Sequence, residues 1–422
     1  MRITRIAAGV LVSTLCLAGC AGTADDGGDA DGGGGELSAV PGFDPETGTI
    51  KVGVINPLTG PLAAGGQGLL QGLELYVERI NADGGIAGQY PVELVVADSE
   101  YDPQQGIAAY NGMADDVVMI GAVLGTGVVK ALLPQAAADN MLIIPGSDSA
   151  DWLRDPNALP IRPTYQTQVI NAIAYAAGND QDQRFCALLQ DDPLGEAVKD
   201  GVDHAVEELG LDYGDEVRFP TSSTDFTPQI SQLKSGGCDV VVYGASSASA
   251  IPAMSSAVQL DFTPQWLAIG PGFAENLLAS PIVDYISEHW VVGSPAAEWG
   301  DTSVPGMEQL VDDFSEYAEE GDNPQPVLNQ YGYTYGIALS RLLGEAVEQG
   351  DLSHESLLEI SHSDLSLDFM GLTPEFQYGP VEERQAPSAV TIFEIDTGVT
   401  GGLAALEKDF DSDAAQSYEF QG

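Results

Sequence analysis

Basic residues are scarce in this sequence. It holds 14 lysines and arginines against 64 aspartates and glutamates in 422 residues, a formal net charge of -50 at pH 7. A surface this acidic repels phosphate backbones and anionic lipid headgroups. Nucleic acid is therefore excluded as a partner. The acidity suits solubility outside the cell, and a preference for cationic ligands is the alternative.

Long apolar runs are absent after the first twenty residues, so no membrane-spanning helix is expected there. In residues 1–20, Arg2 and Arg5 precede an apolar stretch that ends in Leu-Ala-Gly-Cys. The stretch is too short to cross a bilayer and is typical of a secretory signal peptide. Its last four residues resemble a lipobox, which predicts lipidation of Cys20 and anchoring to the outer face of the cell membrane. A plain secretory signal with an unrelated cysteine is the alternative.

Histidine is rare too, and its positions argue against a metal site. The four histidines are His204, His289, His354 and His362. None has the spacing of a metal-binding motif. The Ser-x-x-Lys of residues 231–234 lacks the Lys-Thr-Gly of penicillin-binding enzymes, and Gly66-Gln67-Gly68 lacks a correctly spaced third glycine for a dinucleotide loop. We therefore expect no metal, no cofactor and no enzymatic activity, with a secreted hydrolase as a remote alternative.

Of the four cysteines, Cys186 and Cys238 would remain in the mature chain besides the lipidated one. Each begins an apparent strand, and the two strands would be neighbours in an open parallel sheet of 2-1-3 order. Two thiols in an oxidising compartment favour a disulfide. We predict that these cysteines pair, with two separate buried thiols as the alternative.

From Thr49 onward, short β-branched runs alternate with amphipathic helical stretches, and the pattern restarts after residues 162–165. Such alternation predicts βαβ units and parallel sheets covered by helices. The fold class is therefore α/β, with two Rossmann-like lobes. Residues 21–48 are expected to be a flexible tether, because residues 21–35 are almost wholly Gly, Asp, Ala and Thr.

The expected strands and helices fall into two series. In the first series we expect strands at 50–55, 92–97, 117–122 and 141–145, and helices at 69–80, from 103 and from 127. In the second we expect strands at 185–190, 216–219, 240–243 and 265–269, and helices at 195–209, 227–234 and 251–260. A helix at 331–349 and a strand at 389–395 follow. We assign 49–165 with 292–372 to the first lobe and 166–291 with 373–422 to the second.

Several stretches are similar to the branched-chain amino-acid binding proteins. Residues 50–61 (Ile-Lys-Val-Gly-Val-Ile-Asn-Pro-Leu-Thr-Gly-Pro), 68–81 and 84–88 resemble the opening of that family, and 98–103 and Gly332-Tyr333 resemble two later motifs. The resemblance covers Thr49 to about Ile395. It implies a type I periplasmic-binding-protein architecture with three crossings between lobes, near 163–167, Gly293 and Leu372. It also implies a small-molecule ligand and an ABC importer permease as partner, and we expect a monomer.

The resemblance places the ligand where the carboxyl ends of the strands of both lobes meet, which agrees with the rule for open α/β sheets. Helix N-termini there offer unpaired N–H groups to a carboxylate. The implied contacts are Gly125, Thr126, Gly127, Ser147, Asp148 and Ser149 in the first lobe, and Leu194, Ser246, Gly272 and Phe273 in the second. Helix capping is the alternative role for the first-lobe loops.

Departures from the family pattern bear on the ligand. Gly65 stands where the family has an aromatic residue over the ligand, and Gly272 replaces the glutamate that holds an amino acid's ammonium. A buried ammonium without a carboxylate is costly, so an α-amino acid would need Asp148 or Glu275 as a substitute.

The family's first-lobe disulfide is missing as well, because Tyr101 and Leu124 occupy its positions. We expect an amino-acid-like or amide-type ligand, captured by hinge closure and delivered to the permease. Ligand sensing with a membrane signalling partner is the alternative.

Overall fold

The computed structural model describes residues 37–60, 62–179 and 182–420. The expected signal peptide, Cys20 and most of the expected tether lie outside these residues. In the described part of the chain, no helix combines the length and the apolar character that crossing a bilayer requires.

The first lobe is built on a parallel sheet with the strand order β2-β1-β3-β4. Its strands are β1 (Ile50–Asn56), β2 (Val92–Asp98), β3 (Met119–Val123) and β4 (Ile143–Pro145). Its helices are α1 (Ala63–Ala82), α2 (Pro103–Met113), α3 (Thr126–Asp139), α9 (Pro305–Tyr317), α10 (Pro326–Gln349) and α11 (His354–Ser361). A short hairpin of β10 (Ser366–Leu367) and β11 (Phe376–Gln377) completes it.

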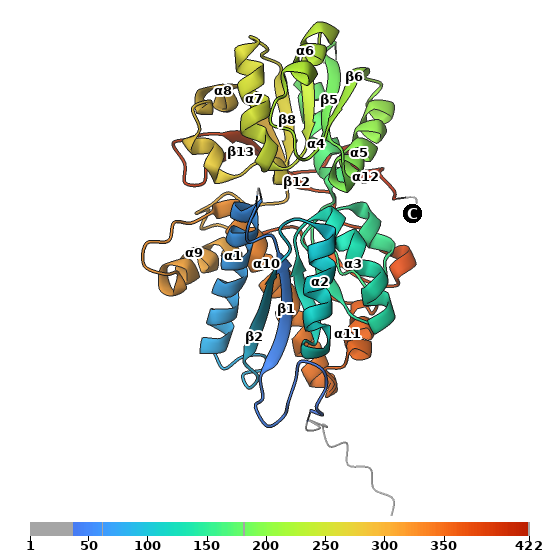
Figure 1. The fold of residues 1–422 in the computed structure, drawn as a ribbon, viewed down its shortest axis with the longest axis vertical. Helices are drawn as coiled ribbons and strands as arrows, with labels where there is room; N and C mark the ends of the chain where they lie inside the picture. The colour runs from blue at the N-terminus through green and yellow to red at the C-terminus, as the bar shows by residue number, and fades with distance from the viewer. Residues whose placement is uncertain (1–36, 61, 180–181, 421–422) are drawn as a thin grey trace, which may run out of the picture. The chain divides into compact units, whose positions relative to one another are not determined.

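Alternating strand residues supply two apolar cores in this lobe, as the period of two in a strand requires. Val52 and Val54 join the core with α1 and α10. Ile55 and Ile120 join the core with α2 and α3 on the other face of the sheet (Figure 1).

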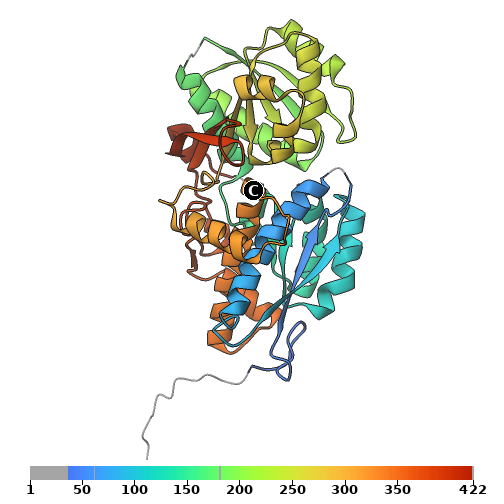
Figure 2. The same cartoon turned by 90° about the vertical axis from the view of Figure 1, so that its left-hand side faces the viewer.

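The second lobe is built on a seven-stranded sheet with the order β13-β12-β9-β8-β7-β5-β6. Its strands are β5 (Arg184–Gln190), β6 (Asp212–Phe219), β7 (Val240–Gly244), β8 (Gln265–Ile269), β9 (Trp290–Ser294), β12 (Val390–Ile395) and β13 (Leu403–Phe410). Its helices are α4 (Tyr165–Asn179), α5 (Pro193–Leu209), α6 (Thr227–Gly236), α7 (Ala250–Gln259), α8 (Val283–His289) and α12 (Asp413–Gln416). The strands β5 to β9 run parallel, whereas β12 and β13, red in Figures 1 and 2, are antiparallel additions at one edge. The expected α/β fold with two lobes is confirmed.

A disulfide joins Cys186 and Cys238 within the second lobe, with a Cα–Cα distance of 5.8 Å. Cys186 lies on β5, and Cys238 stands two residues before β7, which pairs with β5. The strand neighbourhood inferred from the sequence is thus the one observed.

Helix α5 begins against the end of β5 because of two local features. Asp192 caps the helix by accepting from the amides of Leu194 and Gly195, and Pro193 occupies its first turn. A Cβ at Gly195 would lie 1.8 Å from the carbonyl oxygen of Gln190, so a glycine is required there. The first turn of α5 is therefore fixed at the carboxyl edge of the second sheet.

Helices α1 and α10 touch through glycines on both sides. A Cβ at Gly72 would lie 2.0 Å from the carbonyl oxygen of Asn329, and a Cβ at Gly332 would lie 1.9 Å from that of Leu69. The two backbones therefore approach as closely as glycine alone allows. This contact holds the long helix α10 against the first lobe.

Two sequence-based boundaries are wrong. Leu37 and Phe43 are 4% exposed and pack into the first-lobe core, so the stretch from Leu37 is part of that lobe and not of a tether. Beyond Leu372, the aromatic residues Phe376 and Tyr378 stack on each other within the same core. The buried Arg384 donates to two first-lobe carbonyls, so the third crossing follows Arg384.

The second crossing lies next to the expected position near Gly293, whereas the domain bound between residues 291 and 292 falls inside β9 (Trp290–Ser294). Gly293 is part of β9 and pairs with Ile392 of β12, so the chain leaves the second lobe only after Ser294. The sheet extension by β12, which sequence reasoning had not paired with β9, keeps residues 292–294 in the second lobe.

We predict that Gly332→Ala lowers the free energy of unfolding by about 1 to 3 kcal/mol, because its methyl group would force α1 and α10 apart. Gly344→Ala on the same helix is the matched control, because nothing lies within 4 Å of its Cβ. That variant should be neutral or stabilising by up to about 1 kcal/mol. Urea titrations followed by circular dichroism measure both, and equal effects would contradict the close packing.

Candidate functional site

A small cavity of about 60 Å³ lies at the edge where the two lobes meet. We call it the cleft pocket. Its described lining residues are Leu62, Gly65, Leu69, Tyr101, Leu124, Gly125, Thr126, Gly146, Asp148, Tyr165, Leu194, Ser246, Ser247, Gly270, Pro271, Phe273, Val327, Leu328 and Tyr331. They follow strands β2, β3 and β4 of one sheet and β7 and β8 of the other, or begin α1, α4, α5 and α10. The pocket thus occupies the position that open parallel sheets use for ligands.

The N-terminus of α3 presents polar groups to this pocket. Gly125 precedes the helix with a φ of 117°, a conformation that L side chains rarely adopt. Thr126 follows as the first helical residue, and the first amides of a helix have no intrahelical partners. Its side-chain hydroxyl is buried, at 1% residue exposure, and has no hydrogen-bond partner among the described residues. A buried hydroxyl without a partner is uncommon and suits a ligand's polar group.

Asp148 also lines the pocket, but its charge is already matched. Its Oδ1 accepts from Nε and Nη2 of Arg162 at 3.1 and 3.0 Å, and its Oδ2 accepts from Nε2 of Gln168 at 3.2 Å. All three side chains are nearly inaccessible to solvent. Burial raises the pKa of Asp148, and Arg162 opposes that rise. In either protonation state Asp148 offers no spare carboxylate to a cationic ligand.

The guanidinium of Arg162 is enclosed by aromatic rings of α10. It stacks over Tyr331 and Tyr335 at 4.5 and 4.9 Å from the ring centroids, and it donates to the Tyr335 hydroxyl at 2.6 Å. Burial alone would lower the pKa of Arg162, but Asp148 and the neighbouring tyrosines raise it above its ordinary value. The arginine therefore stays charged within the junction.

Contacts across the junction bring loops of both lobes to the pocket. The side chain of Gln168 donates to Asp148 in the first lobe and accepts from the amide of Gly270 in the second at 3.2 Å. Tyr331 and Ser294 share a hydroxyl hydrogen bond of 2.8 Å. These bonds fix the Gly270 loop opposite Asp148.

Gln190 organises the second-lobe wall. Its Oε1 accepts from the amide and the hydroxyl of Ser246, at 3.3 and 3.1 Å. From the first lobe, Tyr101 approaches the same side chain, which opposes the rise in the pKa of its phenol. Burial raises the pKa of Tyr101, as does the nearby charge of Asp192, so its phenol stays neutral.

The remaining walls are apolar. Leucine, valine, proline and aromatic side chains from both lobes form them, namely Leu62, Leu69, Leu124, Leu194, Pro271, Phe273, Val327 and Leu328. Among the described lining residues, Asp148 is the one with a charged side chain. A ligand with an apolar body and one polar end fits such a lining.

The substitute carboxylate considered for an ammonium, Glu275, is not a lining residue. Its Oε1 accepts from the amide of Val327 at the start of α10, at 3.1 Å, and its Oε2 is buried without a partner among the described residues. Burial raises the pKa of Glu275, which disfavours its charged form. Glu275 is connected to the pocket wall through the amide of Val327, which lines the pocket.

The structure brings together six of the ten residues proposed from the sequence. Gly125, Thr126, Asp148, Leu194, Ser246 and Phe273 line the cleft pocket. The other four do not. The hydroxyl of Ser147 bonds the Trp152 indole, and that of Ser149 caps the following turn. Gly127 faces Pro103, and Gly272 packs on Ala268 and Tyr243.

Sequence reasoning missed the three tyrosines of the pocket, Tyr101, Tyr165 and Tyr331. Tyr331 directly precedes the Gly332-Tyr333 pair that had been singled out, so its helical position was available as a signal. Tyr101 had been noted as the replacement of a family cysteine. The left-handed backbone conformation of Tyr101, which sets the direction of its ring, has no signature in the sequence.

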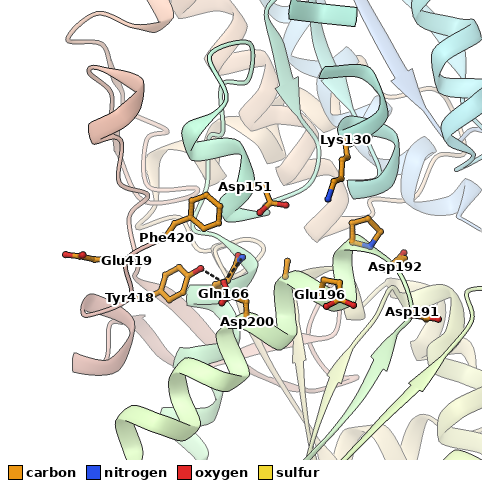
Figure 3. Close-up of a pocket in the computed structure, with 12 residues that line it drawn as sticks. Lys130, Asp151, Gln166, Asp191, Asp192, Glu196, Asp200, Tyr418, Glu419 and Phe420 are labelled. Carbon is orange, nitrogen blue, oxygen red and sulfur yellow. Dashed lines mark hydrogen bonds between the residues drawn. The ribbon is translucent and has the colours of Figure 1, made fainter. Parts of the chain in front are cut away.

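A second and larger hollow of about 450 Å³ lies beside the pocket, between α3 and α5 (Figure 3). Lys130 and Asp151 face Glu196 and Asp200 across it. Two of its carboxylates already have structural partners, since Asp200 accepts from Gln166 and Tyr418 and Glu196 pairs with Arg218. We therefore assign the candidate site to the cleft pocket.

Comparisons with known proteins agree with this geometry. The Leu/Ile/Val-binding protein homolog 3 of Brucella melitensis is 27% identical over 259 residues, which is 59% of this chain and 65% of that protein. Homolog 2 of Brucella abortus is 29% identical over 55% of this chain and 63% of its own length. The chain thus spans slightly less than two thirds of these relatives.

Solved structures share the fold. The fatty acid ABC transporter substrate-binding protein from Thermomonospora curvata superposes with a TM-score of 0.83 at 24% identity, covering 90% of this chain and 97% of that one. A branched-chain amino acid ABC transporter protein from Thermus thermophilus with bound valine gives 0.77 at 16% identity, covering 87% and 98%.

The family profile described as periplasmic binding protein matches residues 49–400, which is most of the chain and includes every lining residue of the cleft pocket. The chain therefore belongs to the periplasmic binding protein family.

Proposed function

We propose that this protein is the extracytoplasmic solute-binding component of an ABC importer, and that it captures a small acid with an apolar body by closure of its two lobes. The observation that carries the proposal is the cleft pocket. It combines apolar walls and an unpartnered Thr126 hydroxyl with a carboxylate that Arg162 already neutralises. Family membership and the names of the similar proteins support transport and an acid ligand.

The expected capture follows from these groups. The carboxylate of the ligand would accept from the Thr126 hydroxyl and from the free amides at the start of α3. Its apolar part would lie against the leucines and Phe273. Ligand contacts from both lobes favour the closed form, since a ligand shifts a conformational equilibrium by its differential affinity. The ligand would be released unchanged to the permease.

The neutral cleft predicts a preference between two matched ligands. 4-Methylpentanoate and L-leucine share the carboxylate and the isobutyl group, and differ in the α-ammonium. We expect 4-methylpentanoate to bind at least about tenfold more tightly, because a buried ammonium without a partner is costly. Isothermal titration calorimetry and thermal shift measure both ligands, with octanoate as a gauge of tolerated length.

The opposite ranking would contradict the neutral cleft and would point to Glu275 as the ammonium acceptor. Glu275→Gln should then weaken the binding of leucine and leave the binding of 4-methylpentanoate unaffected.

Loss of uptake of the bound acid by cells that lack the protein would distinguish import from sensing.

Thr126→Val tests the polar end of the pocket. The valine keeps the shape of threonine and removes a hydroxyl that has no partner in the ligand-free protein, so the melting temperature should stay the same or rise. Affinity for 4-methylpentanoate should fall about five- to tenfold, as expected for one lost hydrogen bond of about 1 kcal/mol or slightly more. Ser147→Ala is the control, and equal losses in both variants would refute this placement of the acid.

We also propose that the chain is anchored by lipid through Cys20. Cys20→Ala should move the protein from the detergent phase to the aqueous phase in Triton X-114 partitioning and into the culture medium, because the acyl chains supply the membrane affinity. Cys16→Ala, within the same segment, should leave partitioning unchanged. Retention of the Cys20→Ala protein on the membrane would contradict the lipid anchor.

A further inference from the structure

The loop between β2 and α2 holds two consecutive non-glycine residues in the left-handed region. Glu100 has a φ of 50° and Tyr101 a φ of 61°. This region is sparsely populated by residues that carry a Cβ, and two in succession are maintained only when the surroundings enforce them. Such outliers cluster at functional sites, which directs attention to what the loop presents.

Hydrogen bonds on both sides hold this loop in place. Asp98 accepts from the amides of Leu58 and Glu100, both at 2.8 Å, and from the hydroxyl of Thr59 at 2.6 Å. Asp102 donates its amide to the carbonyl of Ser99 at 2.7 Å and caps α2 with its side chain. The strained pair is therefore anchored before and after by aspartates.

The ring of Tyr101 lies on the backbone of Gly125 at the wall of the cleft pocket. A Cβ at Gly125 would lie 2.9 and 3.1 Å from Cε2 and Cδ2 of that ring. The Tyr101 side chain also reaches Gln190 of the second lobe. One side chain from the first lobe thus covers the α3 N-terminus and touches the facing lobe.

The loop leading into α1 contributes no ring to the same pocket. Gly65 lines it without a side chain, and Leu62 and Leu69 are aliphatic. Of the loops that precede α1 and α2, the one before α2 therefore supplies the aromatic side chain of the pocket, which is Tyr101. Its neighbour Glu100 is exposed and does not line the pocket.

We infer that the ring of Tyr101 covers the ligand and that the same side chain contacts the second lobe at Gln190. Its ring would close over the apolar part of the acid, and its contact with Gln190 would form as the lobes come together. The left-handed loop serves to aim the ring. This inference rests on the proposed function, because it requires a ligand in the cleft pocket.

Glycine substitutions separate this role from ordinary packing. Tyr101→Gly relieves the backbone strain but removes the packed ring, so the melting temperature of the ligand-free protein should fall by less than the loss of a buried tyrosine alone would cause. Affinity for 4-methylpentanoate should fall about tenfold or more, because the aromatic cover is gone.

Glu100→Gly is the matched control, since it relieves the same kind of backbone strain at a residue that does not line the pocket. Its affinity for 4-methylpentanoate should stay within about twofold of wild type. Tyr101→Phe, which keeps the ring and loses the hydroxyl, should fall between the two.

A Tyr101→Gly protein that melts earlier yet binds as tightly as wild type would show a structural residue and overturn the inference. If the wild-type protein binds L-leucine instead of 4-methylpentanoate, the same variants are measured with leucine. If the wild-type protein binds neither ligand, the proposed ligand class is refuted. Small-angle X-ray scattering of the ligand-free variants then tests the inference about Tyr101. The ligand-free Tyr101→Gly protein should have a larger radius of gyration than Glu100→Gly, and equal radii would overturn the inference.

Discussion

The buried ion pair of Arg162 and Asp148 is the interaction on which the first-lobe side of the junction depends. Arg162 stands at the first crossing between lobes, is 1% exposed, and contacts the carboxylate of Asp148, the hydroxyl of Thr334 and two tyrosine rings of α10. Burying one charge is expensive, and the cost is offset only when its partner and the remaining donors are all satisfied. Loss of either member of the pair leaves the other unmatched, at a cost of about 3 to 5 kcal/mol.

This pair also sets the electrostatics of the cleft. The protein carries a formal net charge of -50, yet the pocket is lined by apolar groups and by a carboxylate that is already paired. The acidic residues therefore determine the surface charge and the solubility of the protein. Recognition inside the pocket relies on shape, apolar contact and a few hydrogen-bond donors. A preference for cationic ligands does not follow from the net charge.

Much of this arrangement could be predicted from the sequence. Alternating β-branched and amphipathic segments indicated the fold class, and the family resemblance, together with the rule for parallel sheets, predicted Gly125, Thr126 and Asp148, which line the cleft pocket. Contacts made by distant segments were not predictable. Ser147 was proposed beside Asp148, but a bond to Trp152 turns it away. The third crossing was placed near Leu372 because the packing of Phe376 and Tyr378 onto the first lobe has no local signature.

The disulfide has a consequence for motion. Cys186 and Cys238 both belong to the second lobe and connect neighbouring strands, so the covalent link spans no part of the junction. The disulfide can thus stabilise one lobe against thermal unfolding without restricting the proposed movement of the lobes. Covalent reinforcement of one lobe and the proposed closure of the two lobes are therefore compatible, because they involve different parts of the chain.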